Sequence, residues 1–278
     1  MSYLLEKWAP LTVYGSSQEL MMLPPYDATS TTGPGGVPTQ YVPTVAGGLF
    51  DGLGGADAYV LSQVIRHAGT FVSTDDPEAF DVRFQAIAGA LGKAGRLWRK
   101  WIGAEVRHWC FARFTTLEGE KAQGQLVYQP IVMEFTRTSP WFAELASTQQ
   151  VTLGVTPYSF VVTRDVAANA PVFDAVITVT AQGVGITDLV IENTTNGSYI
   201  RFTGATIAVG TSLVIDCGAG TVKNNGVNAI AYFSLGASHA IPDWLRLEAG
   251  GSVNTIRVTR AGGGSNSTIR FDFYEAWK

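Results

Sequence analysis

The sequence predicts a mainly β protein with two domains and a single α-helix in the first domain. Three observations support this class: charged residues make up only 15% of the 278 residues, glycine occurs 31 times, and short alternating segments recur between turn residues. Typical soluble domains carry about 25% charged residues and about 7% glycine. The surface is therefore expected to be polar, neutral and rich in turns, and the length suits two domains that each bury a core.

The N-terminal half is expected to alternate strands with irregular segments. The first fifty residues are interrupted by Pro24-Pro25, by Pro and Gly between residues 30 and 38, and by Pro43. This composition predicts a long loop, and a loop of this length in a compact domain is usually functional or ordered by a partner. We therefore expect Pro24 to Pro43 to be ordered by neighbouring subunits. Strands are predicted at residues 59–65, 69–72, 80–88, 105–115 and 123–136.

One amphipathic helix is predicted from about Gly89 to Ile102. Its apolar residues follow the helical period, and its basic residues fall mainly on the opposite side. The basic residues proposed as a subunit-contact face are Lys93, Arg96, Arg99 and Lys100. The alternative is an ordinary solvated face. Trp98 and Trp101 are expected to pack in the core rather than to stack on bases, because the helical period places them opposite most of the charge.

The domain boundary is placed between residues 145 and 146. Residues 143–150 are polar and lack the alternation of a strand. This boundary gives an N-terminal domain of residues 1–145 and a C-terminal domain of residues 146–278.

The C-terminal half is predicted to be nearly all strand and turn. Strands are expected at residues 158–163, 175–180, 189–193, 199–202, 212–217, 229–232, 244–247, 255–259 and 268–274. Their spacing and their Gly, Asn, Ser and Thr boundaries are typical of a β-sandwich or jelly roll. Ile269, Phe271 and Phe273 are expected to face inward from the last strand, and Asn224-Asn225-Gly226 to form a hairpin turn.

No pattern of catalytic, metal-binding or cofactor-binding residues emerges. His67, His108 and His239 lack zinc-site spacing, and no Gly-x-Ser-x-Gly nucleophile elbow occurs. The segments at Gly92 and Gly183 do not complete a phosphate-binding or dinucleotide-binding motif. The sequence therefore predicts a binding or structural protein, not an enzyme, with no cofactor and no metal.

Charge, cysteine content and hydropathy exclude further classes. The formal net charge of −4 gives no long-range attraction to nucleic-acid phosphates. Cys110 and Cys217 fall in different domains, so no disulfide framework is expected. The sequence indicates neither a signal peptide nor a membrane span. Asn193, Asn196 and Asn266 match glycosylation acceptors, which we interpret as chance matches.

The C-terminal half resembles the distal tail proteins (Dit) of long-tailed, siphophage-type bacteriophages through an ordered set of patterns. In order, these are Gly210-x-x-Leu213-x-Ile215-Asp216, Val222-x-x-Asn225-Gly226, Trp244-Leu245-x-Leu247 with Gly250, Asn254-Thr255-Ile256-x-Val258, and Ile269-x-Phe271-x-Phe273-Tyr274-x-x-Trp277. The segment between Gly250 and Asn254 is longer than the family pattern. The N-terminal half resembles the family more loosely, through its Gly48-Leu49-Phe50-Asp51-Gly52-Leu53-Gly54 segment and the order of its predicted elements.

The resemblance implies a structural role in a phage virion. It implies an N-terminal belt domain, a β-barrel or split β-sandwich with one helix, that forms a homohexameric ring at the distal end of the tail and continues its channel. It implies an outward-facing, galectin-like C-terminal β-sandwich. The implied partners are the tail tube protein, the tail hub or tail-associated protein in the baseplate, and the tape measure protein. The protein would be made in the host cytoplasm.

Two other functions were weighed against this one. The first is a carbohydrate-binding module for attachment to host-surface glycans, for which Tyr232 and Trp244 are the candidate aromatic residues. The second is a glycan hydrolase, which needs a pair of carboxylates in a cleft, and the sequence offers no pair to nominate.

Overall fold

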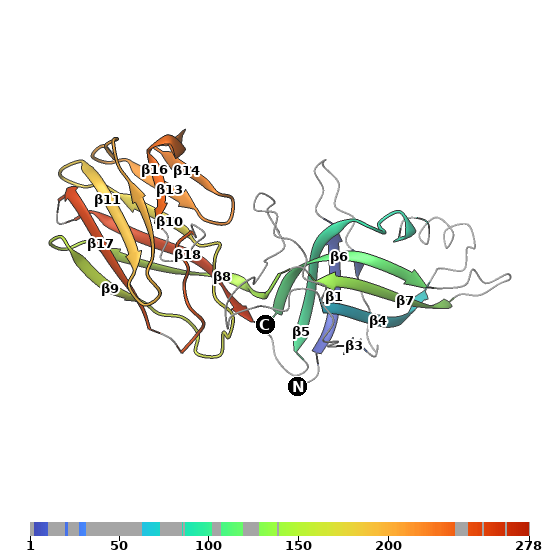
Figure 1. The fold of residues 1–278 in the computed structure, drawn as a ribbon. Helices are drawn as coiled ribbons and strands as arrows, with labels where there is room; N and C mark the ends of the chain where they lie inside the picture. Colours follow the sequence, from blue (N-terminus) through green and yellow to red (C-terminus); the bar gives the residue numbers. More distant parts are fainter. Residues whose placement is uncertain are drawn as a thin grey trace. The chain divides into compact units, whose positions relative to one another are not determined.

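In the computed structural model, the chain forms two compact units, Met1–Glu144 (unit 1) and Leu145–Lys278 (unit 2). The structure describes residues 3–10, 20–21, 28–31, 63–72, 85, 87–101, 107–118, 128–137, 139–236, 244–251, 253–264 and 266–277. Both units consist of antiparallel strands (Figure 1). The prediction of a mainly β fold is therefore confirmed.

Unit 1 is built on one run of antiparallel strands in the order β3-β4-β7-β6-β5-β1-β2. Its strands are β1 (Tyr3–Pro10), β2 (Leu20–Met21), β3 (Ala28–Thr31), β4 (Gln63–Val72), β5 (Ala94–Trp101), β6 (Arg107–Glu118) and β7 (Tyr128–Arg137). β1 also contacts β3, from the other end of the run, so the sheet curls toward itself. The first residues of β8 (Trp141–Thr152) pair with the start of β6 at Phe142 and Ala143.

The predicted helix from Gly89 to Ile102 is wrong, because Ala94–Trp101 form strand β5. This segment pairs with β1 on one side and β6 on the other, so both sets of its backbone groups are used in ladders. Leu91, which completed the apparent helical period, lies in a turn before the strand. Residues 85 and 87–88 are helical instead, which also corrects the end of the strand predicted at 80–88; residues 80–84 lie outside the described residues.

The expectation that the first fifty residues are irregular is also corrected. β1, β2 and β3 lie in this segment, and β3 falls within the predicted loop from Pro24 to Pro43. The glycine-rich segment from Gly48 to Gly54 lies outside the described residues. The strands predicted at 59–65 and 69–72 are one strand, β4, over its described length.

Unit 2 is a β-sandwich of two antiparallel sheets (Figure 1). One sheet, here called the β10 sheet, has the strand order β15-β14-β13-β10-β18-β8, and the other, the β11 sheet, has the order β16-β12-β11-β17-β9. The strands that follow β8 are β9 (Tyr158–Val162), β10 (Val176–Thr180), β11 (Ile186–Asn193), β12 (Ser198–Phe202), β13 (Ser212–Asp216), β14 (Thr221–Asn224), β15 (Val227–Asn228), β16 (Phe233–Gly236), β17 (Asn254–Gly262) and β18 (Thr268–Trp277). A 3-10 turn, η1 (Ile230–Tyr232), precedes β16.

The core of unit 2 is formed by alternate residues of the two sheets. The predicted inward residues of the last strand, Ile269, Phe271 and Phe273, are buried, whereas Arg270 is exposed. The β11 sheet contributes the fully buried Ile191, Ile200, Phe202, Ile256 and Val258. Each such side chain contributes about 1.5–3 kcal/mol through burial. The predicted hairpin is also present, because Asn225 and Gly226 adopt positive φ between β14 and β15.

The polar segment 143–150, which showed no strand alternation, lies within strand β8. Its outer half does alternate in exposure, but the half-buried positions are polar, so an apolar pattern was missing. Gln149 is one of these half-buried polar residues, and its hydrogen bonds give the reason for its position. Its side-chain amide donates to the carbonyl of Val161 (2.6 Å) and accepts from the amide of Thr163 (2.9 Å), so it acts as a ladder partner for edge strand β9.

Candidate functional site

The four basic residues predicted as a contact face do not share one face. In strand β5, Arg96 and Lys100 point to one side and Arg99 to the other. Lys93 and Arg96 are exposed, Lys100 is half-buried, and Arg99 is buried. The guanidinium of Arg96 lies 4.4 Å from the ring centroid of Trp109. Arg99 is therefore removed from the predicted contact face, and a subunit contact through Lys93, Arg96 and Lys100 stays a prediction.

Arg99 belongs to a buried cluster beneath β5 and β6. Its guanidinium lies 4.0 Å from the ring centroid of Trp141, and that of Arg137 lies 5.9 Å from the same ring. Stacking of this kind contributes about 0.5–2 kcal/mol each. Burial, together with the positive charge of Arg99, lowers the pKa of His108 to about 4. Burial raises the pKa of Cys110 to about 12, against the opposing effect of Arg137 and Arg99.

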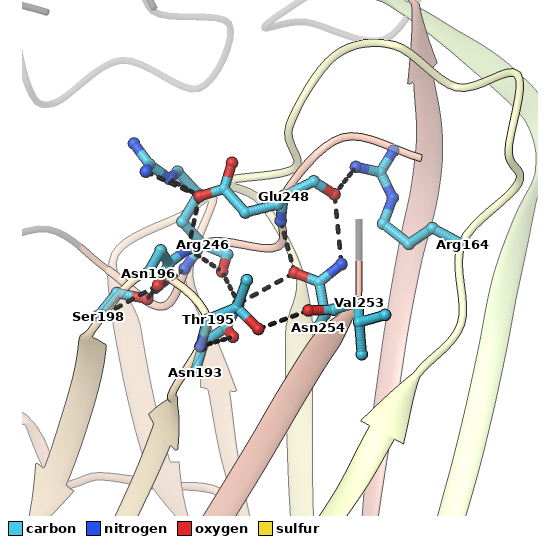
Figure 2. Close-up of polar contacts among 9 residues, drawn as sticks. All are labelled: Arg164, Asn193, Thr195, Asn196, Ser198, Arg246, Glu248, Val253 and Asn254. Atoms are coloured by element: carbon cyan, nitrogen blue, oxygen red, sulfur yellow. Dashed lines mark hydrogen bonds and ion pairs between the residues drawn. The ribbon is translucent and has the colours of Figure 1, made fainter. Parts of the chain in front are cut away.

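A polar network stands at one end of the unit 2 sandwich, where strand residues that face the core are polar (Figure 2). Asn193 ends β11, Ser198 begins β12 and Asn254 begins β17, and all three are buried. The side chain of Asn193 donates to the carbonyl of Arg246 (2.7 Å) and to Oδ1 of Asn254 (3.0 Å). Buried amides are tolerated when their hydrogen bonds are made in this way.

The network holds the backbone of residues 246–248 against the strand ends. The amide of Glu248 donates to Oδ1 of Asn254 (2.6 Å), and the amide of Arg246 donates to Oγ of Ser198 (3.2 Å). Leu245 and Leu247 on either side of Arg246 are fully buried. Leu247 itself forms an antiparallel bridge with Val172, and the three side chains bind the backbone groups on either side of it.

Gly250 belongs to the Dit-like sequence pattern, and close backbone packing requires a glycine at this position. A Cβ atom at this position would lie 1.7 Å from the carbonyl oxygen of Asp165 and 2.6 Å from that of Ala168. The amide of Gly250 donates to the carbonyl of Ala168, so the two segments are in direct backbone contact. Only glycine allows this approach.

A buried ion pair joins three segments of the same end. Arg164 donates through Nε (3.0 Å) and Nη2 (2.8 Å) to Oε2 of Glu275, on the last strand. Its Nη1 donates to the carbonyls of Ala170 (2.9 Å) and Glu248 (2.6 Å). Oε1 of Glu275 accepts from the amide of Asp165 (2.8 Å). Both charged groups are therefore compensated and hydrogen-bonded, which a buried pair requires.

A second carboxyl, that of the half-buried Asp174, lies two residues before β10. Burial raises its pKa to about 6, and the nearby carboxylate of Asp216 acts in the same direction, whereas its own backbone amide and Arg164 oppose it. Its Oδ1 is enclosed and accepts no hydrogen bond from the described residues. Burial also raises the pKa of the neighbouring Cys217 thiol. Both cysteines are buried and free.

The residues weighed for chemistry are not assembled into a metal or catalytic centre in the described part of the chain. No group of three or more His, Cys, Asp and Glu residues there could hold a metal ion. His67 lies on β4, His108 is buried in β6, and His239 lies outside the described residues. No described helix is long and apolar enough to cross a membrane.

The structure places the candidate sugar-binding aromatics Trp244 and Tyr232 and two of the three predicted glycosylation acceptors, Asn193 and Asn196. The Trp244 ring stacks on Phe233 with 4.9 Å between the ring centroids, and Tyr232 is 46% exposed beside Phe202. Asn193 is fully buried, and the amide of Asn196 donates to Arg246 and Glu248. These two asparagines belong to the network, which sequence analysis missed because inward polar residues look like turn residues.

The comparisons with known proteins agree with the pattern of motifs. Residues 168–277 match the sequence family described as siphovirus-type tail component, C-terminal domain. Among curated proteins, none matches the sequence. The crystal structure of SPP1 Dit, described as a paradigm of the hub adsorption apparatus in phages that infect Gram-positive bacteria, aligns with a TM-score of 0.55 at 10% identity. The alignment covers 98% of each chain and shows a shared fold.

Two structures of the phage p2 baseplate in its activated conformation, with Ca and with Sr, also align. Each covers 98% of both chains at 7% identity, with a TM-score of 0.47. This score is too low to support an inference about this chain. The network residues Asn193, Ser198 and Asn254, together with Leu247 and Gly250, lie inside the segment that matches the tail component family.

Proposed function

We propose that this chain is a distal tail protein that forms a homohexameric ring, because residues 168–277 match the family described as siphovirus-type tail component, C-terminal domain. The ring would sit at the distal end of the tail, join the tail tube to the hub of the baseplate, and continue the tail channel. The single observation that carries this proposal is the family match, supported by a fold shared with SPP1 Dit over 98% of the chain.

In this proposal, unit 1 is the ring-forming domain and unit 2 faces outward. The surface of unit 1 offers a basic strip for a subunit contact, with Lys93 and Arg96 exposed and Lys100 half-buried at its end. Arg107 lies opposite Lys100 on β6 and forms an ion pair with Glu144 (3.7 Å). Neighbours in a closed ring would cover strand edges that are unsuitable for an isolated subunit.

The mechanism is assembly rather than catalysis. The proposed partners are the tail tube protein, the tail hub or tail-associated protein, and the tape measure protein in the channel. The proposed location is the virion. Binding of host-surface glycans stays a prediction, which a glycan array with the purified protein would test.

The experiment is to measure the mass and shape of the purified full chain. Six copies of a 29.7 kDa chain form a particle of about 178 kDa, which mass photometry resolves from a monomer and which negative-stain images show as a ring. Arg96→Glu reverses a charge on the proposed contact strip and is expected to reduce the ring population. Arg201→Glu, an exposed arginine on unit 2, is the matched control.

Two results would count against the proposal. A monomer at all micromolar concentrations contradicts the ring. Equal loss of the ring in Arg96→Glu and Arg201→Glu contradicts the assignment of the contact to the strip on unit 1.

A further inference from the structure

The sequence contains two Asn-Gly dipeptides, Asn196-Gly197 and Asn225-Gly226, and both lie in unit 2. An asparagine followed by a glycine can react without an enzyme, because the backbone nitrogen of the glycine can attack the side-chain amide carbon of the asparagine. Glycine favours this attack, since it has no side chain to hinder the approach and leaves the backbone free to rotate. The hydrogen bonds of the two reacting groups therefore decide which dipeptide reacts in the folded protein.

Asn225-Gly226 forms the exposed turn between β14 and β15. Both residues have positive φ, 51° for Asn225 and 78° for Gly226, as expected for a two-residue hairpin turn. Among the described residues, no group is hydrogen-bonded to the side chain of Asn225 or to the amide of Gly226. The amide carbon and the attacking nitrogen are therefore both accessible at this turn.

The strand that follows this turn has few contacts to hold it. β15 is two residues long, both of them are exposed, and it lies at the edge of the β10 sheet, where it pairs only with β14. A segment with few buried contacts opens locally at a small cost in free energy. Such opening lets Asn225 leave its positive φ, so that its Cγ atom approaches the nitrogen of Gly226.

The side chain of Asn196, in contrast, is held by the polar network (Figure 2). Its nitrogen donates to the carbonyl of Arg246 (3.0 Å) and to Oε1 of Glu248 (2.8 Å). Its Oδ1 accepts from the amide (2.9 Å) and from the hydroxyl (2.7 Å) of Ser198. Both ends of this amide group are thus fixed by hydrogen bonds.

The nitrogen that would attack Asn196 is engaged as well. The amide of Gly197 donates to the carbonyl of Asn193 (2.8 Å), a residue that is fully buried. Hydrogen bonds that must break before a reaction add to its barrier, and the loss of one or two of them corresponds to a rate about tenfold lower. The two dipeptides therefore differ at both reacting groups.

We propose that Asn225 is a site of spontaneous deamidation in the folded protein, and that the polar network protects Asn196 from the same reaction. The nitrogen of Gly226 forms a bond to Cγ of Asn225, and the bond from Cγ to the side-chain nitrogen breaks. The proton of the Gly226 amide leaves with that nitrogen as ammonia, and a five-membered imide ring remains. One water molecule then opens the ring, at Cγ to give aspartate or at the backbone carbonyl carbon to give isoaspartate.

Either product changes the surface at the β14–β15 hairpin. Residues 224–232 contain no Asp, Glu, Lys, Arg or His, so the new carboxylate is the first charge in this stretch. Isoaspartate also adds a carbon to the backbone of a two-residue turn, which disturbs the pairing of β15 with β14. The hairpin therefore changes in charge and in pairing as the protein ages. The inference does not rest on the ring proposed above.

The test is to incubate the purified full chain in mildly alkaline buffer and to follow both asparagines by peptide mapping with mass spectrometry. Conversion of Asn225 is expected to be at least about tenfold faster than conversion of Asn196, and to yield both aspartate and isoaspartate. The same incubation in concentrated urea removes the hydrogen bonds that distinguish the two sites. Their rates are then expected to become similar.

Two variants link the reaction to Asn225 in the intact chain. Asn225→Gly removes the reactive amide and keeps a residue that tolerates positive φ, so the hairpin is expected to fold, which circular dichroism checks. This variant is expected to lose the main acidic species that isoelectric focusing detects after incubation of the parent chain. Asn225→Asp marks the position to which that species migrates.

Equal rates at the two asparagines in the folded chain, or a faster rate at Asn196, would overturn the inference. An acidic species that persists unchanged in Asn225→Gly would also overturn it, because the reacting group would then lie elsewhere. A difference between the two sites that remains in urea contradicts protection by the network, and a product without isoaspartate contradicts the ring intermediate.

Discussion

The buried carboxyl of Asp174 gives the protein a pH dependence whose sign follows from the structure. Its pKa is about 6 in the folded chain, against an ordinary value of 3.8. Between these values the folded state binds a proton that the unfolded state has lost. The free energy of unfolding therefore falls as pH rises from about 4 to about 6, and the loss is complete above the folded pKa.

The magnitude follows from the same two values. One pKa unit corresponds to about 1.4 kcal/mol, so ionised Asp174 costs about 3 kcal/mol above pH 6. Replacement by asparagine keeps the size of the side chain and removes its charge at every pH. Asp174→Asn is therefore expected to be more stable than the parent chain by up to about 3 kcal/mol at pH 8, and by little at pH 4.

The assay is urea unfolding at a series of pH values from about 4 to 8, followed by circular dichroism and tryptophan fluorescence. The quantity to compare is the difference between parent and variant at each pH, because other groups titrate equally in both chains. Asp165→Asn, which removes an exposed carboxyl from a nearby loop, is the control and is expected to keep the parent profile. A difference between parent and Asp174→Asn that stays constant across this pH range would refute the reasoning.

Three other perturbations test separate parts of the structure by the same unfolding assay. His108, whose pKa is lowered to about 4, stabilises the fold when neutral, so the parent should lose about 3 kcal/mol relative to His108→Gln as pH falls from 6.5 to 4. Gly250→Ala should lower the free energy of unfolding of unit 2 by about 3 kcal/mol or more. The control Gly210→Ala, where a Cβ meets nothing within 4 Å but φ is positive, should lower it by about 1–2 kcal/mol. Arg164→Met and Glu275→Leu should each cost about 3–5 kcal/mol, and the double variant clearly less than their sum; additive costs would contradict the buried pair.

Alternation of apolar and polar residues predicted some strands and misled at others: residues 230–232 form a 3-10 turn, and residues 244–247 form only one bridge, at Leu247. The last strand could be predicted because Ile269, Phe271 and Phe273 occupy its inward positions. Strand β5 could not, because its inward residue Arg99 is charged and is accommodated by stacking on Trp141. The contact that makes Arg99 an inward residue comes from a distant part of the chain, so local periodicity does not contain it.

The polar network could be predicted from the sequence only in part. The sequence predicts Asn193 at the end of a strand and Ser198 and Asn254 immediately before strands, and the structure places all three at strand ends. What cannot be read locally is that all three face inward and share the backbone of residues 246–248 as their partner. The family-like patterns around Leu247, Gly250 and Asn254 could be recognised from the sequence, but their physical reason needed the packing.

At each end of unit 2, one buried arginine binds the carbonyl groups of the loops. At one end Arg164 donates to the carbonyls of Ala170 and Glu248, and at the other Arg260 donates to those of Gly154 and Gly262. A buried guanidinium therefore orders the loops at each end from inside the sandwich. Because these cations point inward, they add no charge to the surface that the loops present. At the end that Arg260 orders, loop residues 153–157, 181–185 and 203–211 contain no charged residue and expose Val155, Val184 and Val209.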